Sequence, residues 1–157
     1  DNREPEKGVG ASSGTGFWQI ANEGEINSLH IGIQRNSNTL KLFDAAHQLG
    51  MKYIISDEIF FENLPHLIIK IDEFLEQIDR LYITICMDVF NAAIAPGVSA
   101  TAYNGIFADV SFLTLYRYIL KNEKLVALDV AEVNPSLDIA DRTARLAGSL
   151  VNEWFMI

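Results

Sequence analysis

The sequence predicts a single α/β domain, residues 1–157, organised around a parallel sheet. Short apolar segments alternate with amphipathic helical patterns, an order typical of strands joined by helical crossovers. The run LYITI at residues 81–85 has no charge and no polar alternation, as expected of a strand covered on both faces. A chain of 157 residues with 49% hydrophobic side chains can bury the core of one such domain.

The first part of the chain is predicted to hold a glycine-rich loop, two helices and two strands. Leu29, Ile31 and Ile33 alternate as on one face of a strand, and Gly24 and Gly50 stand where helical patterns stop. The predicted elements are a loop at 1–16, a short helix at 17–22, a strand at 28–34, a helix at 38–49 and a strand at 52–56.

The second part is predicted to continue the alternation after residues 57–63, which show no clear pattern. Pro65 suits the first turn of a helix, and Asp109 suits an N-cap. The predicted elements are a helix at 65–78, a strand at 81–85, a helix at 109–121, a strand at 125–130 and a helix at 138–155.

The composition excludes several classes of partner. The formal net charge is -9 and no Lys/Arg cluster is present, so we expect no nucleic-acid partner. No apolar run approaches about 18 residues, so we expect no membrane span. The single cysteine favours a reducing compartment, and we expect a cytoplasmic location. The chain opens DNREPEKG, with no signal peptide and no initiator Met, which suggests removal of a segment or a piece of a longer protein.

Acidic residues follow two of the predicted strands. Asp88 comes just after the 81–85 strand, and Asp129 and Glu132 close the 125–130 run. Parallel strands end at one edge of a sheet, where open α/β sheets bind their ligands. The pattern predicts a negatively charged pocket, although each acid taken alone is equally explained as a turn or capping residue.

Three further features have both a structural and a functional interpretation. The APGVS loop forms either a rigid lip over a pocket or a simple turn, and the SSGT loop either binds a substrate carboxylate or is a flexible terminus. Cys86 stands two residues before Asp88, on the same side of an extended strand, and is either a small core residue or a metal-facing one. The histidines show no metal-ligand spacing and are expected to be surface or satisfied residues: His30, His47 and His66.

Five segments together resemble the ureohydrolases, the arginase and agmatinase group, and within it the formimidoylglutamases. The resemblance covers nearly the whole chain. The segments are TICMDVFNAAIAPGVSA (84–100), ALDVAEVNPSLD (127–138), SSGTGFWQI (12–20), IGIQRNSNT (31–39) and DRTARLA (141–147).

The resemblance implies a three-layer αβα fold of the arginase type, with the amino-terminal strands of the parallel sheet missing here. It also implies two manganese ions sharing a hydroxide that attacks a small-molecule substrate, with N-formimidoyl-L-glutamate giving L-glutamate and formamide. Family members are commonly homo-oligomers. Other ureohydrolase substrates, agmatine or arginine, remain the alternative within the family.

Site residues are carried over from the family's motifs by position. Metal ligands would be Asp1, Asp88 and the residue at the position of Cys86. Asp88 and Glu132 would be catalytic, with Glu132 facing the formimidoyl nitrogens and Asp129 supporting it. The contacts to the substrate carboxylate would be Arg3, Ser13 and Thr15.

Two departures from the family pattern bear on function. Cys86 replaces the first aspartate of the strand motif, and a thiolate favours zinc over manganese. The family's upstream ligand motifs are absent, so we expect a carboxyl-terminal fragment with weak or no activity alone. A non-catalytic relative with a degraded metal site is the competing interpretation.

Overall fold

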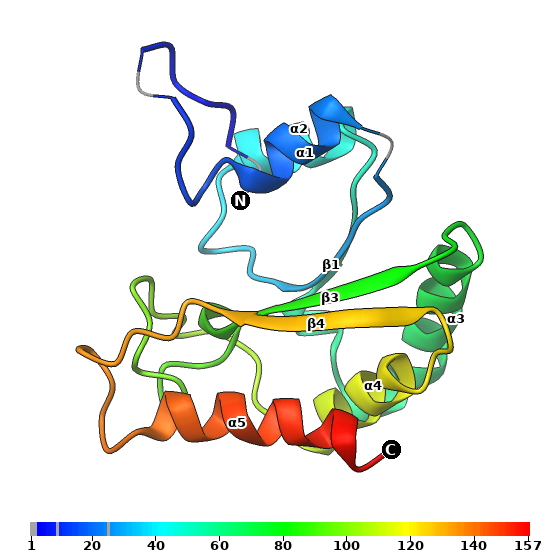
Figure 1. The fold of residues 1–157 in the computed structure, drawn as a ribbon, viewed down its shortest axis with the longest axis vertical. Helices are drawn as coiled ribbons and strands as arrows, with labels where there is room; N and C mark the ends of the chain where they lie inside the picture. Colours follow the sequence, from blue (N-terminus) through cyan, green and yellow to red (C-terminus); the bar gives the residue numbers. More distant parts are fainter. Residues whose placement is uncertain (1–2, 9, 25) are drawn as a thin grey trace.

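The computed structural model describes residues 3–8, 10–24 and 26–157, and Asp1, a predicted metal ligand, lies outside them. Helices and strands alternate in the predicted order (Figure 1). The helices are α1 (Gly16–Glu23), α2 (Leu40–Gln48), α3 (Leu64–Leu75), α4 (Val110–Leu120) and α5 (Arg142–Phe155). The strands are β1 (Leu29–Ile33), β2 (Lys52–Ile55), β3 (Leu81–Cys86) and β4 (Leu125–Ala131).

The strands form two separate parallel pairs rather than one continuous sheet. β1 pairs with β2, and β3 pairs with β4. Figure 1 shows β1 running alongside β3 on the side away from β4. Within the described residues no ladder joins β1 to β3, so the prediction of parallel strands is confirmed while the single sheet is not.

Two apolar clusters pack against the strand pairs, and the second also contains Leu81 of β3 and Leu115 of α4. The β3–β4 pair packs on α4 and α5 through a cluster that includes Ile85, Phe90 and Leu150. The β1–β2 pair packs on α3 through a second cluster. Ile54 and Leu67 are fully buried in that second cluster. Burial of such side chains contributes about 1.5–3 kcal/mol each, so these two clusters stabilise the fold.

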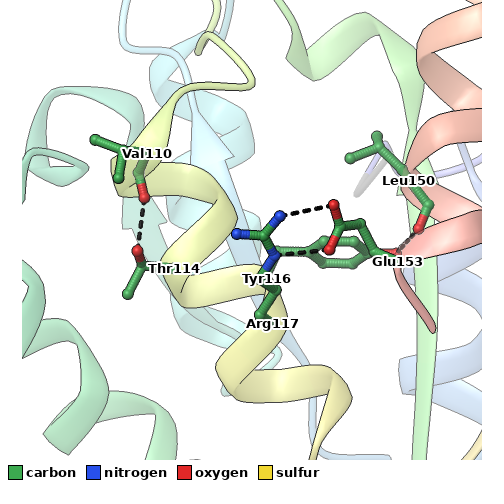
Figure 2. A network of polar contacts seen from close by, with 6 residues as sticks. All are labelled: Val110, Thr114, Tyr116, Arg117, Leu150 and Glu153. Atoms are coloured by element: carbon green, nitrogen blue, oxygen red, sulfur yellow. Dashed lines mark hydrogen bonds and ion pairs between the residues drawn. The ribbon is translucent and has the colours of Figure 1, made fainter. Parts of the chain in front are cut away.

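Helices α4 and α5 are fastened to each other by polar contacts at their carboxyl-terminal ends (Figure 2). The buried Tyr116 hydroxyl donates to the Leu150 carbonyl at 2.9 Å, and burial raises the pKa of Tyr116 to about 12. Beside it, Arg117 Nε and Nη2 donate to the two carboxylate oxygens of Glu153, at 2.6 and 2.8 Å. The fork geometry of this pair fixes how the helices face each other.

The structure corrects two local predictions. Helix α5 begins at Arg142 instead of residue 138, because Ala140 and Asp141 adopt left-handed φ angles of 53° and 56°. Asp88 lies in the 3₁₀ helix η3 (Met87–Val89) and not on an extended strand, so the rule that strand residues two apart share one face does not place it relative to Cys86. Among the described residues, no helix combines the length and apolarity that crossing a bilayer requires.

Candidate functional site

The acids predicted to share a rim follow adjacent strands in the structure. In the parallel register of β3 and β4, Cys86 stands opposite Ala131. Asp88 comes two residues after Cys86, and Glu132 comes directly after Ala131. Both acids therefore leave the sheet at its carboxyl edge, where α/β folds place ligands.

Cys86 is electrostatically linked to both acids. The pKa of its thiol is raised to about 12 by burial, by a hydrogen bond with the Asp88 side chain, and by the charge of Glu132. The thiol is therefore protonated at neutral pH. A protonated thiol is a weak donor, and only its thiolate is a good metal ligand.

Glu132 has an unusual backbone conformation, and the APGVS loop contacts its side chain. Its φ is 66°, in the left-handed region that a residue with a side chain occupies at a cost of about 1–3 kcal/mol. The Ser99 hydroxyl donates to Glu132 Oε2 at 2.7 Å. Sequence reasoning singled out the APGVS loop without assigning Ser99 a role, because a contact across 33 positions leaves no local signal.

The APGVS loop is anchored against the start of α5. The Gly97 amide donates to the buried Thr143 hydroxyl at 2.7 Å, and the Gly97 carbonyl accepts from the Asn134 amide at 2.7 Å. A Cβ placed on Gly97 would lie 2.5 Å from the Cβ of Asp138. Glycine is therefore needed for this close approach, and the loop is anchored at this point, as a tight turn would be.

Asp129 faces a different part of the strand pair. It stands opposite Thr84 in the register, and the Tyr82 hydroxyl donates a hydrogen bond to its carboxylate. This hydrogen bond raises the pKa of Tyr82. Within the described residues, the Asp129 carboxylate is hydrogen-bonded to Tyr82, and no hydrogen bond joins it to Glu132.

Arg3 and the SSGT loop lie together near the amino-terminal end of the chain. The Arg3 amide donates to the Gly14 carbonyl at 3.1 Å. Thr15 is 4% exposed, and its hydroxyl accepts from the Ser12 amide and from Gln19 Nε2 and donates to the Ser12 carbonyl. Thr15 thus organises the loop, while Arg3 and Ser13 are exposed.

The donor set in the described residues is too small for a pair of metal ions. Across residues 3–8, 10–24 and 26–157, no three His, Cys, Asp or Glu side chains are grouped to hold a metal. Manganese prefers oxygen ligands, and the strand ends offer the Asp88 carboxylate beside a protonated thiol. Taken by itself this set does not fit two manganese ions, and we derive no chemical step through them.

The whole chain matches the sequence pattern of the arginase family, residues 1–157. It is 43% identical over 150 residues to a formimidoylglutamase of Staphylococcus carnosus, covering 94% of this chain and 48% of that protein. A Ralstonia nicotianae formimidoylglutamase is 42% identical over 156 residues, covering 96% of this chain and 47% of that protein. The chain therefore spans about half the length of the curated relatives it matches.

Solved structures match the fold. The crystal structure of a Bacillus subtilis formimidoylglutamase superposes with a TM-score of 0.88 at 25% identity, covering 98% of this chain and 49% of that chain. An arginase from Bacillus caldovelox gives a TM-score of 0.70 at 20% identity, covering 81% and 42% respectively. The α/β fold with parallel strands is thus of the arginase type, as the sequence predicted.

Proposed function

Because the chain belongs to the arginase family, we propose that it forms part of a metal-dependent hydrolase that converts N-formimidoyl-L-glutamate to L-glutamate and formamide. The proposal is supported by one observation above all: Asp88 and Glu132 follow adjacent parallel strands at the same edge of the sheet. It is also supported by relatives named formimidoylglutamase that are 43% and 42% identical. The activity is proposed for this chain completed by the half of the fold that it does not cover.

Within that enzyme the acids of this chain have distinct roles. Asp88 would contribute a carboxylate to a manganese site that residues beyond the described ones complete. Glu132 would accept hydrogen bonds from the formimidoyl nitrogens and stabilise their positive charge, which a preorganised carboxylate does well in a water-poor site. Ser99 would hold that carboxylate in place. Manganese, when bound, would supply an activated water.

The substrate carboxylate would be bound by the amino-terminal loop. Arg3 offers a guanidinium and Ser13 a hydroxyl, both exposed, beside a loop that Thr15 keeps in shape. Agmatine lacks a carboxylate, so this loop favours a glutamate-like substrate over agmatine.

The test is turnover in a completed enzyme. This chain is co-expressed with the half of the Staphylococcus carnosus relative that it does not cover, loaded with manganese, and offered formimidoylglutamate, agmatine and arginine in turn. We expect formamide release from formimidoylglutamate, no urea release from agmatine or arginine, and a loss of about a hundredfold or more in kcat for Glu132→Gln. No turnover with any substrate, or faster turnover of agmatine, would contradict the proposal.

Cys86 favours a second candidate, a non-catalytic relative that keeps the fold. A protonated thiol stands where the family pattern has an aspartate, next to Asp88. Cys86→Asp in the same complex separates the two. If the natural protein is non-catalytic, the substitution raises manganese affinity and turnover strongly. If the natural protein is an active hydrolase, turnover is present before the substitution is made.

A further inference from the structure

The turn that precedes α4 contains Asn104 followed by Gly105, the single Asn-Gly pair in the chain. A residue without a side chain leaves its backbone nitrogen open to close approach by the side chain before it. After an asparagine, that approach closes a five-membered succinimide ring, the first step of deamidation. The sequence is therefore most susceptible to this modification at Asn104.

Packing explains why a glycine stands at position 105. A Cβ on Gly105 would lie 2.6 Å from the carbonyl carbon of Phe90 and 2.6 Å from the amide nitrogen of Asn91, both of them backbone atoms. Backbone cannot rotate away as the end of a flexible side chain can, so a larger residue would push the turn off the segment after η3. The fold thus requires a residue without a side chain directly after Asn104.

The groups that would react are not engaged elsewhere. Asn104 is exposed and lies in a turn at residues 103–104. Within the described part of the chain, the Gly105 amide donates to no backbone carbonyl, whereas the next amide, that of Ile106, donates to the Val89 carbonyl at 3.0 Å. The Gly105 nitrogen is therefore free to meet the Asn104 side chain when that side chain folds back.

We propose that Asn104 is a site of spontaneous deamidation. The Gly105 nitrogen gives its proton to hydroxide and attacks Asn104 Cγ. The new N–Cγ bond closes the succinimide while the Cγ–Nδ2 bond breaks, and ammonia leaves with a proton taken from water. A water molecule then opens the ring at either carbonyl, which leaves aspartate or isoaspartate at position 104. The reaction needs only this chain and water, so the inference is independent of the proposed hydrolysis.

The isoaspartate product loosens the segment that follows Asp88. In isoaspartate the main chain runs through the side-chain methylene, so the turn becomes one carbon atom longer. On one side of the turn the Ala102 carbonyl accepts from the Ala92 amide at 2.7 Å, and on the other the Ile106 carbonyl accepts from the Asn91 amide at 2.8 Å. A lengthened turn cannot keep both hydrogen bonds in register, so at least one of them is lost.

Ageing of the complex with the uncovered half of the Staphylococcus carnosus relative tests the modification. Peptide mass spectrometry at intervals follows the gain of about 1 Da that marks an amide converted to an acid. We expect Asn104 to convert within about tenfold of its rate in concentrated urea, because an exposed turn opens at little cost in free energy. Asn36 is the internal control, since it is also exposed in a turn but precedes Ser37, and it should convert far more slowly. Conversion of Asn104 more than about a hundredfold slower than in urea, or no faster than that of Asn36, overturns the proposal.

Two variants in the same complex test the consequence by hydrogen exchange. Asn104→Gln keeps an amide but closes its larger ring much more slowly, and freshly prepared Asn104→Asp adds the charge without lengthening the main chain. In the aged natural chain we expect the amides of Asn91 and Ala92 to exchange faster by on the order of tenfold. Aged Asn104→Gln and fresh Asn104→Asp should exchange like unaged protein. Exchange that ageing leaves unchanged, or that Asn104→Asp raises equally, would refute the loosening by a lengthened turn.

Discussion

At the residue scale, Gly97 shows how the anchoring of the APGVS loop depends on the absence of a side chain. Gly97→Ala brings a Cβ within 2.5 Å of the Asp138 Cβ and 2.8 Å of its Cα. We expect a loss of about 2–3 kcal/mol in the free energy of unfolding, measured by urea denaturation. Gly148→Ala is the control, because a Cβ there meets nothing within 4 Å and alanine favours the helix, so this change should stabilise by about 0.5–1 kcal/mol. Equal stability of the two variants would contradict the packing argument.

His30 gives the fold a specific sensitivity to acid. Burial lowers its pKa from 6.5 to about 4, so the folded state resists protonation that the unfolded chain accepts. Its contribution to stability is complete above pH 6.5 and is lost as the pH falls through 4.

The expected result is that His30→Phe reduces the loss of stability between pH 7 and pH 4 by on the order of 2–3 kcal/mol, measured from urea midpoints at each pH. His66→Gln should keep the full loss. Indistinguishable pH profiles for the two variants would refute this role for His30.

Capping decides where α4 begins, at the scale of a single element. Asp109 accepts hydrogen bonds from the amides of Ser111 and Phe112 at 3.0 and 3.1 Å. We expect Asp109→Ala to cost about 1 kcal/mol of unfolding free energy and Asp109→Asn to cost much less, because asparagine is also a good N-cap. Thermal and urea unfolding of both variants provides the measurement, and similar losses for the two would argue against capping.

Elements with local signals were predictable from sequence. Asp109 precedes α4 as its cap, and Gly24 ends α1, where its backbone N–H donates a hydrogen bond to the Ile20 carbonyl. The start of α5 was placed too early because left-handed Ala140 and Asp141 have no sequence signature as clear as glycine. Asp138 nevertheless serves that helix from outside, accepting from the amides of Thr143 and Ala144.

Pairing between distant segments was not predictable in the same way. A continuous apolar run identified β3 and the acid after it, and so the shared rim of Asp88 and Glu132. The separation of β1 from β3 depends on contacts that periodicity does not encode. The bond from Ser99 to Glu132 and the bond from Tyr82 to Asp129 are likewise tertiary, so the roles of Ser99 and Tyr82 became visible only in the structure.

At the scale of the whole molecule, one face of the β3–β4 pair is open. The run at 81–85 was predicted to be covered on both faces, but in this structure Tyr82 is 55% exposed and Thr84 is exposed as well. Parallel sheets are normally covered on both faces, so this surface belongs against further structure.

The chain alone is therefore expected to bind a hydrophobic dye such as 8-anilinonaphthalene-1-sulfonate, which fluoresces on exposed apolar surface. Adding the uncovered half of a relative should reduce that fluorescence several-fold in proportion to complex formed. Bovine serum albumin at the same concentration, corrected for its own dye binding, controls for crowding. Fluorescence that the second half leaves unchanged would mean that these surfaces stay open in the complex.

The junction between the APGVS loop and α5 links the carboxyl-terminal helix to Glu132. The Thr143 hydroxyl, in the first turn of that helix, accepts a hydrogen bond from the Gly97 amide. Two positions beyond Gly97, Ser99 of the same loop donates a hydrogen bond to Glu132. A change in the first turn of that helix that displaces Thr143 would therefore also displace the Glu132 carboxylate, about a dozen residues away along the chain. In the proposed hydrolase, such a change would alter turnover through the position of Glu132.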